Sequence, residues 1–133
     1  MYLEMLTETE RKIFMDLAYQ AMECDGAIQQ AEMETLKSYE VECQLPGFKR
    51  TQRTEKECIK LLKKSEMPHR RIVLLELTGI WSADNEWKDA ELAMMDRVAA
   101  GLGISATVAS RIRRWSREFR EIIADGFKLF MED

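Results

Sequence analysis

Two stretches of the chain decide the fold: residues 23–36 read ECDGAIQQAEMETL, and residues 82–105, which begin 59 positions later, read SADNEWKDAELAMMDRVAAGLGIS. Each follows a run of apolar residues at helical spacing and leads through an acidic loop into a second such run. At that offset, apolar residues coincide on both sides of the loop, pairing Ile13 with Ile72, Ala21 with Ile80, Met33 with Leu92 and Leu36 with Met95. Because register is hard to keep across a loop by chance, the comparison predicts two copies of one helix-loop-helix unit.

Residues typical of helix ends divide the rest of the chain. They are the capping boxes Thr7 with Glu10 and Thr54 with Glu57, the break at Pro46-Gly47, the separator Pro68 and the cap Ser105. No stretch of strand length alternates apolar and polar residues with period two, so no sheet is expected. The sequence therefore predicts an all-α protein, a compact bundle of about six helices with an internal pseudo-twofold repeat.

The 133 residues fit a single domain, 1–133, with repeat one at about 7–46, repeat two at about 68–105 and a C-terminal helix at about 105–125. Hydrophobic residues make up 46% of the chain and charged residues 33%, which are globular proportions. No apolar run approaches the roughly 20 residues that cross a bilayer, and the first residues lack the features of a signal peptide. We therefore expect a cytoplasmic protein without membrane insertion.

The residue types that enzymes use are sparse. The chain has no glycine-rich phosphate loop, no serine elbow and no cysteine-histidine pair, so we expect no catalysis. Cys24, Cys43 and Cys58 are odd in number and widely spaced, which favours small core residues in a reducing compartment. Glu76 is the one charged residue inside a strongly apolar run, and we expect its carboxylate to point outward between the apolar stripes.

Asp25 and Glu32 in the first loop, and Asp84 and Glu91 in the second, are the candidate functional residues. Their spacing matches only the second half of a calcium-binding EF-hand loop, so a full calcium cage is not expected. In one interpretation the aspartates end a helix and the glutamates lie in the first turn of the next, where negative charge complements the helix dipole. In the other, symmetry gathers the four carboxylates into an oxygen-rich site for Ca²⁺ or Mg²⁺.

The two quoted stretches also resemble the TerB family of tellurite-resistance proteins, over most of the chain. The resemblance implies a compact all-helical domain with internal pseudo-symmetry, metal-binding acidic loops and an association with tellurite or other stress, without established catalysis. Asn85 and Trp87 depart from the glycine and aliphatic residue usual in that loop, and Gln29 and Lys88 stand where better helix caps are expected. The sequence thus predicts a non-catalytic, stress-associated binding or interaction module.

A DNA-binding protein is the alternative, because residues 92–120 contain a segment similar to a helix-turn-helix motif. After Ser105 the spacing departs from the motif: Thr107 and Val108 come one residue early, which turns the second helix by about 100° relative to its packing face. Its five arginines could still contact phosphates. A solvated helix face explains them equally, so we expect no nucleic-acid partner.

Charge and the C-terminal residues point to a protein partner. Residues 1–48 carry net charge −7, residues 49–71 carry +6 and residues 72–133 carry −3. Such an uneven distribution could steer a charged partner or pair with a second copy of the chain, although a solvated helix face explains it too. The apolar residues that follow Gly126 are expected either to pack back on the core or to dock onto a second chain, as in a homodimer.

Overall fold

Helices account for most of the chain in the computed structural model, which describes residues 1–82 and 87–132. The elements are a short 3-10 helix and six α-helices: η1 (Leu3–Met5), α1 (Glu8–Glu23), α2 (Gln30–Glu42), α3 (Glu55–Leu62), α4 (Met67–Trp81), α5 (Asp89–Gly101) and α6 (Ala106–Met131). No strand occurs in the described ranges, and the predicted all-α bundle of six helices is confirmed. None of these helices has the length and apolarity of a membrane span.

Capping residues begin the helices where the sequence indicates. The hydroxyl oxygens of Thr7 and Thr54 accept from backbone N–H groups three residues later, and the glutamates there accept from the threonine N–H groups in return. Ser105 caps α6 by accepting from the N–H of Val108 at 3.2 Å. Each bond satisfies a donor that the first helical turn leaves without a partner.

The bounds of the helices recur at the offset of 59 residues. α4 begins 59 residues after α1, and α5 occupies the positions of α2 shifted by the same number. Arg11 donates from Nε to the carbonyl oxygen of Leu6 (3.1 Å) and from Nη1 to that of Cys43 (2.9 Å). Arg70 makes the two corresponding bonds, at 2.8 and 3.2 Å, to carbonyl oxygens 59 residues further along. These recurrences support the duplication, while the twofold relation between the halves stays a prediction.

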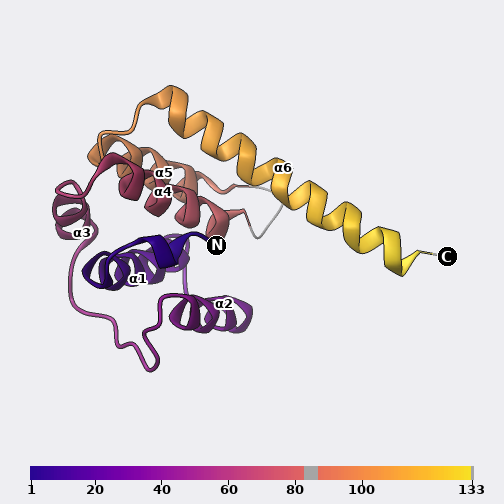
Figure 1. The fold of residues 1–133 in the computed structure, drawn as a ribbon, viewed down its shortest axis with the longest axis horizontal. Coiled ribbons are helices and arrows are strands. Elements are labelled where there is room, and N and C mark those ends of the chain that lie inside the picture. The colour runs from indigo at the N-terminus through magenta and orange to yellow at the C-terminus, as the bar shows by residue number, and fades with distance from the viewer. Residues whose placement is uncertain (83–86, 133) are drawn as a thin grey trace.

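α1 and α4 form the centre of the bundle, where the two halves meet. The indole N–H of Trp81 on α4 donates to the carbonyl oxygen of Ala21 on α1 at 3.0 Å, and both residues are buried. α3 packs against α1 and α5, and α2 against α1. α6 crosses over α4 and α5, and its C-terminal half extends beyond the other helices (Figure 1).

Glu76 differs from its predicted orientation. Its side chain is buried and accepts from the backbone N–H of Tyr2 at 2.8 Å, so the expectation that it points outward is wrong. The physical reason is that α4 is enclosed by α1, α5, α6 and η1, which leaves little of its surface in water. The carboxylate is tolerated there because the start of the chain supplies hydrogen-bond donors.

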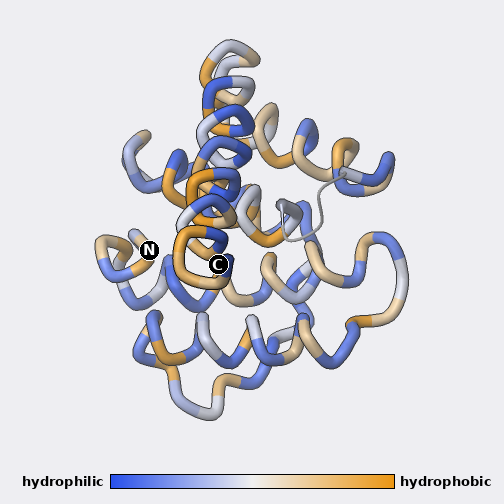
Figure 2. The backbone as a smooth tube through the Cα atoms, turned by 90° about the vertical axis from the view of Figure 1, so that its right-hand side faces the viewer, coloured by the Kyte–Doolittle hydropathy of each residue, from blue (hydrophilic) through white to orange (hydrophobic). Residues whose placement is uncertain are grey.

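The last helix is longer than predicted. α6 continues through Gly126 to Met131 instead of ending near residue 125. A glycine inside a helix costs about 1 kcal/mol relative to alanine, which is too little to end a helix flanked by good helix formers. The apolar residues after Gly126 do not pack back on the core, since Phe127, Leu129 and Phe130 are all more than half exposed. Figure 1 shows these last turns lying beyond the other helices, and in Figure 2 the C-terminal end of α6 is drawn in front of the bundle.

Glu10 gives the contact between α1 and α4 a dependence on pH. Its carboxylate lies 2.8 Å from Nδ1 of His69, which occupies the first turn of α4. Burial by itself raises the pKa of the Glu10 carboxyl, but hydrogen bonds from Ser65, Thr7 and His69 outweigh burial and hold the pKa below its ordinary value of 4.5. A carboxyl whose pKa is lower in the folded state stabilises the fold above its unfolded pKa and loses that contribution on acidification.

We therefore expect the free energy of unfolding to fall as the pH drops through 4.5 towards the lower pKa of folded Glu10. Glu10→Gln, which keeps an oxygen to accept from Thr7 N–H but cannot ionise, should show a shallower fall. Urea unfolding midpoints measured from neutral pH down through this range would test it. Parallel pH profiles for the two proteins would contradict the assignment.

Candidate ligand site between the two acidic loops

The connection between α1 and α2 and the starts of α2 and α5 line one cavity of about 610 Å³. The connection contributes Asp25, the first turn of α2 contributes Glu32, and the first turn of α5 contributes Glu91. Ile80 and Trp81, at the end of α4, form an apolar part of the wall. Three of the four predicted carboxylates therefore line a common cavity, and the fourth, Asp84, lies outside the described residues.

Glu32 and Glu91 hold equivalent positions at the starts of α2 and α5. Glu32 Oε1 accepts from the backbone N–H of Gln29 at 2.9 Å, and Glu91 Oε1 accepts from that of Lys88 at 2.8 Å. Both glutamates thus lie in first turns, as the helix-dipole interpretation has it, and each completes the N-terminus of its helix. The carboxylates are fixed in place before any ligand arrives.

Asp25 is joined to the opposite half of the protein. Its Oδ2 lies 2.6 Å from Nζ of Lys88, so an ion pair connects the first loop to the residue before α5. The Lys88 side chain is 59% exposed, and an ion pair of this kind contributes at most about 1 kcal/mol because water and salt screen it. From the sequence, Lys88 was considered only as a poor helix cap, and this ion pair was missed. The feature that indicates it is a basic residue next to an acidic loop.

Negative charge at the site also affects the neighbouring thiol. Burial raises the pKa of Cys24, and the charges of Asp25 and Glu91 raise it further. Arg120 from α6 also lines the cavity, so the pocket contains both signs of charge. Among the described residues that line it, three carboxylates outnumber two basic side chains, so the site favours a small cation or a ligand with a positively charged group. Without a ligand, Lys88 and Arg120 can offset part of the negative charge.

The described part of the chain does not contain a complete metal cage. Over residues 1–82 and 87–132, no three histidine, cysteine, aspartate or glutamate side chains come together as a metal site requires. Hard cations such as Mg²⁺ are commonly held by one or two carboxylates and several waters. The cavity therefore suits a hydrated ion better than a dehydrated one.

The segment proposed as a helix-turn-helix is formed by α5, a short turn and α6. Arg113 lies 3.7 Å from a carboxylate oxygen of Asp96, and Arg117 stacks over the ring of Trp87 at 5.1 Å from its centroid. Arg114 lies 3.7 Å from Glu118, one turn further along α6. At least three of the five arginines thus have partners within the protein, which reduces what remains for phosphate groups.

The chain matches no family model, no curated protein and no solved structure. A functional proposal for this protein must therefore come from its own residues, and the cavity between the acidic loops is the feature in which residues of both halves meet.

Proposed function

We propose that this protein is a non-catalytic binding module whose ligand is a hydrated divalent cation, Mg²⁺ or Ca²⁺, held between its two acidic loops. The observation that carries the proposal is the single cavity that Asp25, Glu32 and Glu91 line from the two halves. The resemblance to the TerB family adds the expectation of a role in tellurite or other stress, in which the bound ion would alter contacts with a partner.

Asp25 is the residue that a cation would engage first. Its present partner, Lys88, supplies a single positive charge through a largely exposed side chain. A divalent ion brings twice that charge to the same carboxylate and attracts it more strongly at equal distance. The ion would therefore compete with Lys88 and, by displacing it, would loosen a link between the two halves.

Glu32 and Glu91 would set the position of the ion without moving. Because each already accepts a backbone hydrogen bond at the start of its helix, its carboxylate is oriented by the fold. The partial positive charge of the two helix N-termini makes these carboxylates weaker ligands than free ones. We therefore expect weak binding, with dissociation constants on the order of 10⁻⁴–10⁻³ M, as in the weaker calcium modules.

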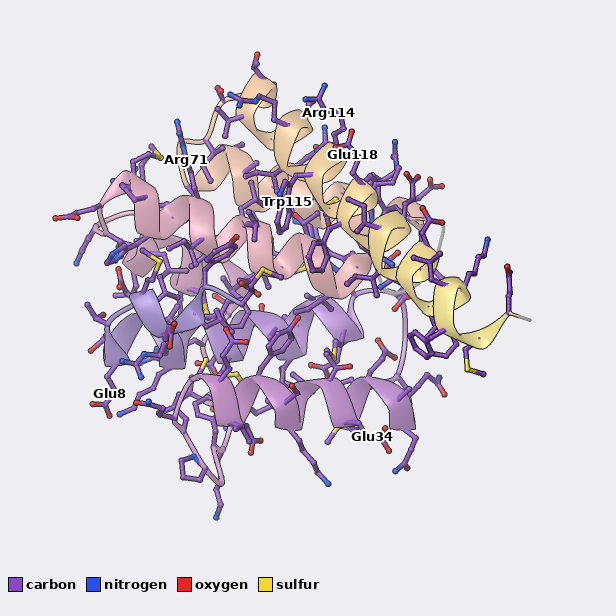
Figure 3. All side chains as sticks on the ribbon, turned by 45° about the vertical axis from the view of Figure 1, so that its right-hand side comes forward. Glu8, Glu34, Arg71, Arg114, Trp115 and Glu118 are labelled. Carbon is purple, nitrogen blue, oxygen red and sulfur yellow. The ribbon has the colours of Figure 1, made fainter. Side chains whose placement is uncertain are left out.

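Calorimetric titration of the whole chain with calcium chloride and with magnesium chloride tests the proposal. Asp25→Asn should weaken binding by about tenfold or more, because it removes the charge of the most accessible carboxylate. Glu34→Gln is the matched control, since Glu34 is exposed on α2 and points away from the bundle (Figure 3). It should leave the titration unchanged.

Lys88→Met supplies a result in the opposite direction. Removing the competing ammonium should tighten binding roughly fivefold, the equivalent of about 1 kcal/mol for a partly exposed ion pair. If neither ion produces heat or a shift in melting temperature with the unmodified chain and with Lys88→Met, the cation proposal is wrong. A change caused equally by Asp25→Asn and Glu34→Gln would show a nonspecific charge effect instead.

A further inference from the structure

The C-terminal half of α6 carries an apolar stripe that the rest of the chain leaves uncovered. Phe119, Ile123, Phe127 and Phe130 recur at intervals of three and four residues, so they lie on one face of the helix. The tail, defined as Ile122 to Met131, includes six large apolar side chains that are each more than half exposed: Ile122, Ile123, Phe127, Leu129, Phe130 and Met131. A continuous apolar surface of this kind marks an interaction site.

A groove of about 540 Å³ follows the N-terminal half of the same helix. Val108, Ile112 and Trp115 of α6 form one wall, and the opposite wall comes from η1 and the start of α4. Two aromatic rings line it, those of Trp115 and Tyr2, whose centroids lie 6.4 Å apart. The groove extends from Val108 to Glu118, roughly 15 Å of helix, and the tail spans nearly the same length.

The charges of tail and groove are opposite. Arg71, Arg111 and Arg114 line the groove and are exposed. Figure 3 shows Arg71 on α4 and Arg114 on α6 on either side of Trp115. The tail carries Asp125 and Lys128, and with the flanking Glu121 and Glu132 the segment has a net charge of −2; all four side chains are exposed. Basic residues therefore surround the apolar groove, and acidic residues accompany the apolar tail.

We propose that the tail of α6 occupies the groove of a second copy of this chain, in a reciprocal dimer with antiparallel α6 helices. A twofold axis near Phe119 sets each tail beside the first half of the partner helix, because positions at equal distances from the axis face one another. Phe127 then lies beside Ile112 in the groove of the partner copy. The same twofold rotation places each tail in the groove of the other copy, so both grooves are filled and both tails are covered, as in an isologous dimer.

The size of the two surfaces agrees with this occupant. A stable dimer buries about 800 Å² on each partner, and six large side chains that are more than half exposed supply most of such an area once covered. Gly126 lies in the middle of the tail, with no atom near the position of a β-carbon, so the partner's backbone can approach there. A parallel pairing would set the basic halves of α6 against each other and leave the grooves empty.

Light scattering of the full chain over a concentration series, combined with size-exclusion chromatography, tests the dimer. The unmodified chain should have the mass of two copies, and Phe127→Glu should raise the dissociation constant by roughly 30-fold or more, as the loss of a central apolar anchor does. Lys128→Glu changes the charge by two units on the opposite face of the helix from the stripe and should leave the mass unchanged. Melting curves would verify that both variants fold.

Met5→Glu separates this arrangement from pairing of tails alone. Met5 lines the groove from η1 and is more than half exposed, so its replacement should weaken the dimer without altering α6. A monomeric unmodified chain, or a dimer insensitive to Met5→Glu, would overturn the proposal.

Vesicles of anionic phospholipid test the other occupant of an amphipathic helix. Sedimentation with vesicles that is abolished by Phe127→Glu, in a chain that is monomeric in solution, would assign the tail to a membrane surface and overturn the dimer. The cation titration is independent of this result, since neither Phe127 nor Met5 lines the cavity between the acidic loops.

Discussion

Trp81→Ala is expected to lower the free energy of unfolding by about 3–5 kcal/mol, the range for removing a large aromatic side chain from a packed core. Trp81 is the largest of the fully buried side chains, and it lies at the end of α4 where the two halves meet. Alanine would leave a cavity and would remove the indole N–H that donates to Ala21. Urea unfolding followed by circular dichroism measures the loss.

Trp81→Phe serves as the comparison. Phenylalanine retains much of the apolar volume but cannot donate to the Ala21 carbonyl, so the loss should be smaller, about 1–3 kcal/mol. A loss below about 1 kcal/mol for Trp81→Ala would show that the interface of the halves relaxes around the missing ring, and that its packing contributes less than burial indicates.

Asp16→Ala is expected to cost about 3 kcal/mol, as the removal of a buried charge with several hydrogen bonds does. The Asp16 carboxylate is buried on α1. It accepts from the backbone N–H of Thr51 at 2.8 Å, from the Thr51 hydroxyl at 2.6 Å and from Arg53 Nη1 at 3.1 Å. These bonds hold the connection between α2 and α3 against α1, so removing the Asp16 carboxylate should make that connection more mobile.

Hydrogen exchange can separate the local effect from the global one. In Asp16→Ala, backbone amides near Thr51 should lose more protection against hydrogen exchange than those of α4, which report only the global fall in stability. Glu8→Ala is the control on the same helix: Glu8 is exposed and forms an ion pair with Lys12 at 3.3 Å, so its loss should cost about 0.5 kcal/mol or less. Equal costs for the two variants would contradict the role given to Asp16.

Local signals in the sequence were sufficient for most helix bounds, because capping residues act within one turn of their own position. Thr7, Thr54 and Ser105 begin helices for reasons contained in neighbouring residues. The end of α6 was predicted too early, since the cost of Gly126 competes with the helix formers around it and the sequence does not show which prevails. Glu76 was placed wrongly because its hydrogen-bond donor, the N–H of Tyr2, is 74 residues away.

The candidate site was predictable only in part. The recurrence of the acidic loops left two interpretations open, first-turn carboxylates that complement helix dipoles or a gathered cation site; Asp25, Glu32 and Glu91 line one cavity, and cation binding there stays a prediction. The ion pair of Asp25 with Lys88 depends on how the halves pack, which periodicity does not determine. The groove beside Trp115 was missed for the same reason, because its two walls come from opposite ends of the chain.

The packing of α1 against α4 has a consequence for how the protein folds. Each of these helices belongs to a different hairpin, and each supplies the surface that buries the apolar face of the other. Neither hairpin has a core of its own, so assembly is a single cooperative event that waits for contacts between residues far apart in sequence. Two separate chains of this kind would each need the other to be stable, and joining them in one polypeptide removes the dependence on concentration.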